Sequence, residues 1–278
     1  MAKKRLDLLL VERGLAVSRS QAQRLIMAGQ VRVDGQVVIK PATLVVPISR
    51  VVVERGPRFV SRGGEKLEAA LDAFKIDVTG LVCADVGAST GGFTDCLLQR
   101  GAAKVYAIDV GKGLLHWKLR SDPRVVVMEE SNARHVEKLP EPASLVTIDA
   151  SFISLRILLP VVKKWFDFSL LTSYSEQSEK REVRSDVIAL VKPQFEAGRK
   201  ESARGEGVIR DPAVHRQVLL DVLTFAQDKG FVVRGLVLSP LLGPKGNVEF
   251  LAWLTFGGEA VTEGLALVES LLFMDKPL

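Results

Sequence analysis

The chain has 278 residues, of which 47% are hydrophobic and 26% are charged. This length allows a sizeable core and favours one large domain plus a smaller one. The sequence has no apolar run of about 18 residues and no signal-peptide pattern, so we expect no membrane span and a cytoplasmic location. Two cysteines, Cys83 and Cys96, fall within a predicted strand and helix, which favours buried free thiols over a disulfide or metal site.

The net charge of +5 is concentrated near the N-terminus. Residues 1–60 carry 11 Lys or Arg and 4 Asp or Glu, whereas the remaining residues are slightly acidic in sum. A basic excess at one end is typical of a polyanion-binding module joined to a near-neutral body. An ordinary solvated basic surface is the alternative that charge alone leaves open.

The first 55 residues predict two helices followed by a hairpin. Apolar spacing predicts a helix over 5–13, and Ser18 with Gln21 forms a capping box for a second helix that ends near Gly29. The pair Asp34-Gly35 lies between two runs of β-branched residues and is a strong signal for a two-residue hairpin turn.

Residues 18–35, SRSQAQRLIMAGQVRVDG, closely resemble the S-four domain, an RNA-binding fold named after a ribosomal protein. In that family the second helix and the following hairpin lie against structured RNA. The resemblance implies contacts to phosphates, which position RNA without reading its sequence. The residues implied in these contacts are Arg5, Arg19, Arg24, Arg32 and Lys40.

A short polar segment follows this region. We expect domain 1–55, a linker over 56–64, and a body over 65–278 that begins with a helix through Phe74. Strands that alternate with helical segments predict an α/β fold with a mostly parallel sheet covered on both faces. The expected strands cover 81–85, 104–109, 125–127, 145–149, 187–192, 231–238 and 249–256.

The first of these strands runs into a loop of small residues, Gly87 to Gly92, and then into a helix. Glycines let such a loop adopt positive φ and let a ligand approach the main chain. Ser89 replaces the middle glycine of the dinucleotide fingerprint. The next strand ends in Asp109, whose carboxylate can accept hydrogen bonds from ribose hydroxyls. These features together favour a nucleoside cofactor.

The loop and the acid that follows it resemble the nucleoside site of class I methyltransferases. The resemblance implies S-adenosylmethionine as the cofactor and a Rossmann-like sheet of seven strands. The residues implied in cofactor binding are Asp85, Gly87, Ala88, Ser89, Thr90, Gly91, Gly92, Phe93, Asp109 and Val110.

Residues at the strand ends narrow the chemistry. Asp149 begins the tetrad DASF, which lacks the paired prolines usual in amino-group methylation, and no cysteine lies at a strand end to serve carbon-5 pyrimidine methylation. Lys66, Asp149, Lys192 and Glu249 instead match, in order and context, the Lys-Asp-Lys-Glu tetrad of FtsJ-like ribose 2′-O-methyltransferases.

The words around these four residues resemble the TlyA family over nearly the whole chain. This family contains the hemolysin A-type enzymes that methylate cytidine ribose 2′-hydroxyls in 16S and 23S ribosomal RNA. The words are SRGGEKL, DASFISL, KPQFEAG and GNVEF, at 61–67, 149–155, 192–198 and 246–250.

The resemblance implies a ribosomal RNA (cytidine-2′-O)-methyltransferase whose partners are ribosomal RNA or ribosomal subunits, with no metal. It implies Lys192 as the base, Asp149 as its orienting partner, and Lys66 and Glu249 as groups that hold the ribose and the lysines. Two other classes stay open: an RNA-binding protein that keeps the fold without transferring methyl, and a membrane-damaging hemolysin.

Two segments are less defined by the sequence. The stretch 168–186 is longer and more polar than is usual in the family, and it precedes a strand at the sheet edge opposite the expected cofactor. The basic, glycine-rich stretch 198–212 follows a strand at the cofactor edge. It is equally consistent with a lid over the target nucleotide and with an ordinary loop.

Overall fold

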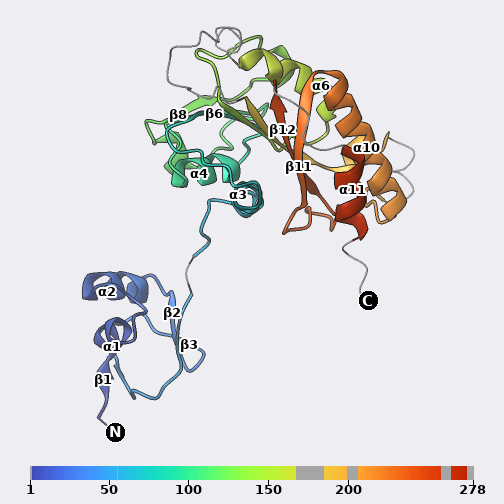
Figure 1. The fold of residues 1–278 in the computed structure, drawn as a ribbon. Helices are drawn as coiled ribbons and strands as arrows, with labels where there is room; N and C mark the ends of the chain where they lie inside the picture. Colours follow the sequence, from blue (N-terminus) through green and yellow to red (C-terminus); the bar gives the residue numbers. More distant parts are fainter. Residues whose placement is uncertain (1, 55, 167–184, 199–205, 258–263, 274–278) are drawn as a thin grey trace, which may run out of the picture. The chain divides into compact units, whose positions relative to one another are not determined.

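The computed structural model of the protein describes residues 2–54, 56–166, 185–198, 206–257 and 264–273. The chain forms two compact units, Met1–Arg58 and Phe59–Leu278, and each has its own apolar core (Figure 1). Most of the stretch 168–186, and residues 199–205 of the glycine-rich stretch, lie outside the described residues.

The N-terminal unit contains the two predicted helices, α1 (Leu6–Glu12) and α2 (Arg19–Met27). Ser18 Oγ accepts a hydrogen bond from Gln21 N at 3.2 Å and so caps α2, as predicted. The strands form one sheet in the order β3-β2-β5 and a second of β1 and β4. They are β1 (Lys4–Arg5), β2 (Val31–Val33), β3 (Gln36–Val37), β4 (Leu44–Val45) and β5 (Val51–Val53).

The predicted hairpin joins β2 and β3. Asp34 and Gly35 have φ angles of 51° and 85°, the left-handed conformation that a two-residue turn of this kind requires at both positions. The turn returns the chain so that Val31 and Val33 face the core of the unit.

The second unit is built on one seven-stranded sheet, as expected. The strand order is β11-β12-β10-β9-β6-β7-β8; β12 pairs antiparallel with β11 and β10, and the pairings from β10 to β8 are parallel. The strands are β6 (Val82–Val86), β7 (Lys104–Ile108), β8 (Val125–Met128), β9 (Leu145–Ile148), β10 (Asp186–Val191), β11 (Phe231–Leu238) and β12 (Phe250–Phe256).

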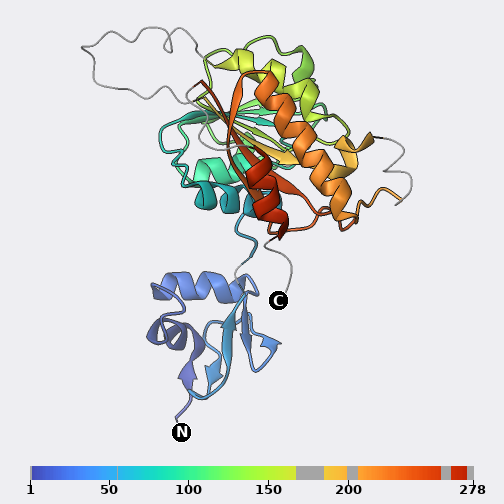
Figure 2. The same ribbon diagram turned by 45° about the vertical axis from the view of Figure 1, so that its right-hand side comes forward.

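Helices cover both faces of this sheet, which gives three layers (Figures 1 and 2). Alternate residues of β10 point into two different apolar clusters, Val187 and Ala189 into one and Ile188 and Leu190 into the other. Helices α3 and α4 pack on the second cluster, and α6, α10 and α11 pack on the first. The helices are α3 (Gly63–Phe74), α4 (Gly92–Gln99), α5 (Trp117–Arg120), α6 (Leu155–Val162), α8 (Pro193–Glu196), α10 (Pro212–Asp228) and α11 (Gly264–Phe273), with 3-10 turns η1 (Ala133–His135) and η2 (Lys163–Trp165).

The body begins earlier than the expected boundary at residue 65. Phe59 is buried against the start of α3, and an added Cβ at Gly64 would lie 2.2 Å from Phe59 Cγ. A glycine at position 64 therefore lets the ring pack directly on the helix backbone. For this reason residues 59–64, which the sequence suggested as part of a linker, contribute to the body.

The cysteines and the lengths of the helices were also the subject of predictions from the sequence. Cys83 in β6 and Cys96 in α4 are buried free thiols, as predicted. Among the helices in the described part of the chain, none is long and apolar enough to cross a bilayer.

Candidate active site

A cavity of about 920 Å³ lies at the edge of the sheet where the parallel strands end. One side is formed by the glycine loop after β6 and by Ser61, Arg62 and Gly63 at the start of α3. The other side is formed by the segments that follow β9 and β10 and by the loop that precedes β12. This is the edge where ligands bind in open parallel sheets.

At two glycines of the loop the packing leaves no room for a side chain. Gly87 has a φ of 83°, and an added Cβ would lie 2.8 Å from the carbonyl oxygen of Asp149. An added Cβ at Gly92 would lie 2.3 Å from Ser61 Oγ. Glycines therefore let the loop pack directly on Asp149 and Ser61, and the loop residues also line the cavity.

Six of the ten residues implied in cofactor binding line this cavity, and four do not. The six are Gly87, Ala88, Ser89, Thr90, Gly92 and Phe93. The four that are absent from the lining are Asp85, Gly91, Asp109 and Val110.

Asp109 supports the glycine loop from the end of β7. Its two carboxylate oxygens accept hydrogen bonds from Ser89 N at 2.8 Å and from Gly111 N at 2.7 Å. The carboxylate thus fixes the loops that follow β6 and β7 relative to each other. Val110, the next residue, is exposed.

Asp85 is completely buried beneath the loop. Its carboxylate accepts hydrogen bonds from Thr94 Oγ1 at 2.7 Å and from Thr147 Oγ1 at 3.2 Å. Burial raises the pKa of Asp85 to about 7, although both threonine hydroxyls favour the ionised form. Asp85 therefore ties β6 to α4 and β9 instead of reaching into the cavity.

This raised pKa predicts that the stability of the body falls as the pH rises from about 4 to about 7. Below that range the Asp85 carboxyl is protonated in both states, and above it the carboxyl is ionised in both. Between these limits the unfolded chain binds fewer protons, which lowers the free energy of unfolding by about 4 kcal/mol in total. Asp85→Asn should remove this slope in denaturation measured across the range, and identical pH profiles for the two proteins would contradict it.

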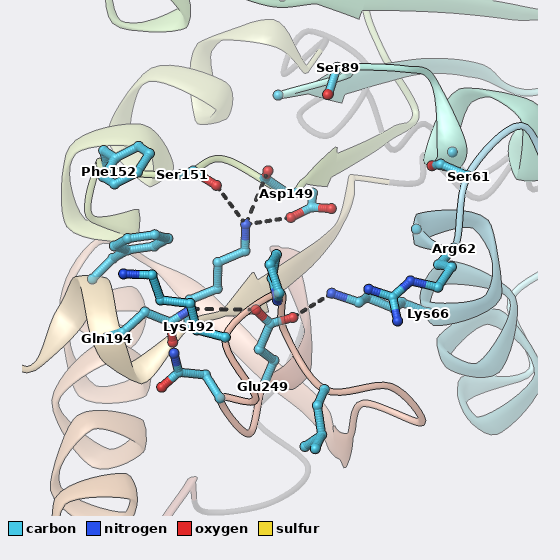
Figure 3. Close-up of a pocket in the computed structure, with 18 of the residues that line it drawn as sticks. Ser61, Arg62, Lys66, Ser89, Asp149, Ser151, Phe152, Lys192, Gln194 and Glu249 are labelled. Carbon is cyan, nitrogen blue, oxygen red and sulfur yellow. Dashed lines mark hydrogen bonds and ion pairs between the residues drawn. The ribbon is translucent and has the colours of Figure 1, made fainter. Parts of the chain in front are cut away.

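The four charged residues of the expected tetrad meet in the cavity as two ion pairs (Figure 3). Lys66 Nζ on α3 lies 2.5 Å from Glu249 Oε2, which directly precedes β12. Lys192 Nζ, which follows β10, lies 2.6 Å from Asp149 Oδ1 at the end of β9. Lys66, Lys192 and Glu249 are buried, so these charges stabilise one another largely out of water.

Several neighbours of the tetrad were not identified as site residues from the sequence. Ser151 Oγ lies 3.1 Å from Lys192 Nζ, and Gln194 Nε2 lies 3.4 Å from Glu249 Oε1. Asn247 accepts a hydrogen bond from Ile209 N at 2.9 Å and so holds the segment after the undescribed residues 199–205. The words DASF and KPQF contain Ser151 and Gln194, but only the fold shows which of their side chains face the cavity.

Phe152 has an unusual conformation for a large apolar residue at the cavity rim. Its φ is 63° and the residue is 91% exposed, although its ring lies 4.9 Å from that of Phe195. The left-handed region is rarely adopted by residues other than glycine and asparagine. Such a backbone conformation persists only where surrounding contacts hold it, and the exposed ring supplies little of that support.

In the N-terminal unit, two of the expected phosphate-binding residues converge on one carboxylate. Asp7 is completely buried, and its Oδ2 lies 2.8 Å from Arg5 Nη2 and 3.1 Å from Arg19 Nε. The Arg5 guanidinium, followed by the Gln23 amide and Arg19, holds the pKa of Asp7 well below its usual range. Asp7 thereby fixes the orientation of both arginines.

The other three expected phosphate contacts differ in their surroundings. Arg32 Nε lies 2.6 Å from Glu54 Oε1 at the surface, so a phosphate would compete with that carboxylate. Arg24 and Lys40 are exposed. Exposed surface ion pairs contribute little to stability, so the pair with Glu54 leaves Arg32 able to change partner.

Comparison with known proteins agrees with this architecture. Residues 59–256 match the FtsJ-like methyltransferase family, and residues 4–47 match the S4 domain, the S-four fold expected from the sequence. The fold and the site thus define a methyltransferase body joined to an S4 domain.

Individual relatives extend the match over most of the chain. The 16S/23S rRNA (cytidine-2′-O)-methyltransferase TlyA of Mycobacterium tuberculosis is 47% identical over 254 residues, which cover 90% of this chain and 89% of that protein. Hemolysin A of Brachyspira hyodysenteriae is 40% identical, with 89% and 98% covered. The solved structure of a candidate hemolysin from Streptococcus thermophilus has a TM-score of 0.69 and 40% identity, with 99% and 96% covered. The chain belongs to the TlyA family of FtsJ-like methyltransferases.

Proposed function

We propose that this protein transfers a methyl group from S-adenosylmethionine to ribose 2′-hydroxyls of cytidines in 16S or 23S ribosomal RNA, or in both. The observation that carries the proposal is the arrangement of two lysine-carboxylate pairs in one cavity with an open glycine loop. The relative from M. tuberculosis, named for this reaction, supports the choice of substrate.

The glycine loop fits a cofactor of this kind. Gly87 and Gly92 let the loop pack on Asp149 and Ser61, where a Cβ would collide, and the cavity of about 920 Å³ extends from that loop to Lys192. We assign the methionine and nucleoside contacts to the six lining residues of the loop and α4, with Asp109 and Asp85 holding the loop from below. Bound S-adenosylmethionine supplies a methyl group on a positively charged sulfur, which makes its carbon electrophilic.

The residues on the opposite side of the cavity serve the ribose hydroxyl. This hydroxyl is a weak nucleophile, so a base must take its proton as the new bond forms. Lys192 is the base in our proposal, after it has released its own proton. Asp149 and Ser151 orient its amine through the contacts at 2.6 and 3.1 Å. Lys66 and Glu249 hold the ribose and the shape of the pocket.

The S4 domain brings the RNA to this site. Arg5, Arg19, Arg24, Arg32 and Lys40 contact phosphates of structured RNA in our proposal, which positions the substrate without base readout. The target nucleotide must leave its helix to reach the cavity, as in other enzymes that act on a nucleotide within a duplex. Ribosomal RNA as the substrate implies a cytoplasmic enzyme that works on ribosomal subunits.

The test is transfer of labelled methyl from S-adenosylmethionine to 30S and 50S subunits that lack the modification. We expect label in nucleotides whose 3′ linkage resists alkaline cleavage, because a 2′-O-methyl group blocks attack by the ribose oxygen. Label in a base would contradict the reaction. Tight binding of subunits without any label would favour an RNA-binding protein that does not transfer methyl, and leakage of liposomes would favour the hemolysin alternative.

A further inference from the structure

We infer that Glu196 is a positioning residue for methyl transfer, because it clamps the loop that carries Asp149 to the segment that carries Lys192. Glu196 ends α8, four residues after Lys192, and its carboxylate faces the start of α6. The inference rests on the proposed function, since the two segments it joins supply the base and its orienting partner.

Both oxygens of Glu196 are used in this clamp. Oε2 accepts a hydrogen bond from Ser154 Oγ at 2.6 Å, and Oε1 accepts one from Leu155 N at 2.8 Å. Ser154 Oγ in turn accepts a hydrogen bond from Arg156 N at 3.1 Å and caps α6. The carboxylate therefore satisfies a free N–H at the helix start, where the positive end of the helix dipole favours a negative charge.

The clamp is the outermost of three successive contacts between the same two segments. At the inner end, Lys192 Nζ lies 2.6 Å from Asp149 Oδ1. Next, the rings of Phe195 and Phe152 lie 4.9 Å apart. Glu196 then closes the series on the residues that follow Phe152. The two segments are thus held in register from the sheet edge to the start of α6.

The conformation of the loop explains why a clamp is needed. Phe152 adopts a φ of 63° and the residue is 91% exposed, so burial of its own ring does little to hold that backbone. Ser154 and Leu155, which lie two and three residues further on, are fixed by Glu196. Release of these two residues would let the loop relax and would shift Asp149 and Ser151 away from the Lys192 amine. Small misplacements of catalytic groups lower rates strongly.

The first variant is Glu196→Ala. We expect a fall in kcat of about 10- to 100-fold, with the affinity for S-adenosylhomocysteine unchanged, because Glu196 is absent from the cavity lining. Glu196→Gln should recover most of the rate, since its amide oxygen can still accept from Leu155 N. Glu141→Ala is the matched control: the Glu141 carboxylate also accepts two hydrogen bonds, here from Lys104 Nζ and Tyr106 OH, and does not line the cavity. It should keep the wild-type rate.

Amide hydrogen exchange tests the clamp without any need for turnover. In Glu196→Ala the Leu155 amide should exchange at least about tenfold faster, while amides of β6 and β7 keep their protection. Ser154→Ala removes one of the two contacts and should show a smaller effect. The double variant should be no slower in methyl transfer than Glu196→Ala, because both changes break one unit.

Unchanged exchange at Leu155 in Glu196→Ala would overturn the inference. The inference would also fail if Glu196→Gln transferred methyl as slowly as Glu196→Ala, or if the loss of rate in Glu196→Ala were matched by a loss of cofactor affinity. If wild-type protein transfers no methyl to ribosomal RNA, the proposed function fails. The exchange result still decides whether Glu196 holds the loop in that case.

Discussion

Lys192→Ala is expected to lower the rate of methyl transfer by about 10²- to 10⁴-fold, the range typical for loss of a general base. Lys192 is buried at the cavity, with its amine oriented by Asp149 and Ser151, and no other lysine of the described lining contacts both of these residues. Lys192→Arg should be nearly as slow, because a guanidinium keeps the charge but does not release its proton in proteins.

Binding measurements separate chemistry from assembly of the site. The affinity of Lys192→Ala for S-adenosylhomocysteine should stay within about twofold of the wild-type value. Binding of this product reports whether the cofactor site is intact, whereas the transfer rate reports the chemical step. Lys163→Ala is the control: Lys163 Nζ donates to the Lys229 carbonyl at 2.9 Å and does not line the cavity. Substantial transfer by Lys192→Ala, or rescue by Lys192→Arg, would mean that Lys192 acts through its charge and that another group takes the proton.

The sheet could be predicted from the sequence because its signals are local. Residues 187–191 of β10 form a continuous apolar run, as expected for a strand covered on both faces, and they are buried together with Asp186 at the start of the strand. The Asp34-Gly35 turn and the Ser18 cap are equally local, and both formed where predicted. Tertiary packing could only reinforce these choices.

Side-chain direction could not be predicted in the same way. Asp85 and Asp109 both occur near strand ends, yet Asp85 is buried on Thr94 and Thr147 while Asp109 holds backbone N–H groups. The direction of each carboxylate depends on at least one partner far away along the chain, Thr147 for Asp85 and Ser89 for Asp109. A position at a strand end therefore predicts at which edge of the sheet a carboxylate lies, but not which groups it contacts.

Contacts made by the N-terminal arginines show the same limit. Charge and spacing indicate a basic surface, but they do not reveal that Asp7 gathers Arg5 and Arg19 at one buried carboxylate. An acid in a mostly basic segment gives no local signal of such a role. The role of Asp7 is evident only from the packing of α1 against α2, which brings Arg19 next to its carboxylate.

The buried pair of Lys66 and Glu249 should be costly to break from either side. Lys66→Met leaves a carboxylate that is 1% exposed without its ammonium, and Glu249→Gln leaves the ammonium without its carboxylate. Each single change should lower the free energy of unfolding of the body by about 3–5 kcal/mol, the usual cost of leaving one buried charge uncompensated. A domain of this size then loses roughly 2–4 °C of melting temperature per kcal/mol.

The double variant separates the structural role of this pair from its functional role. With both charges removed no buried ion is left uncompensated, so Lys66→Met with Glu249→Gln should regain most of the lost stability in thermal unfolding. Methyl transfer should stay low in all three variants if these groups hold the ribose. Recovery of both stability and activity in the double variant would instead show that the pair serves only the fold.

A surface pair provides the comparison for these measurements. Arg156 Nη2 on α6 lies 3.2 Å from Asp221 Oδ2 on α10. Both side chains of this pair are nearly half exposed. Water and salt screen such a pair, so Arg156→Met and Asp221→Asn should each cost less than about 1 kcal/mol and add nearly independently. The contrast matters because the Lys66–Glu249 pair joins α3 to β12 across the cavity. A large coupling for that pair but not for the surface pair would show that the two buried charges stabilise each other and hold the pocket together.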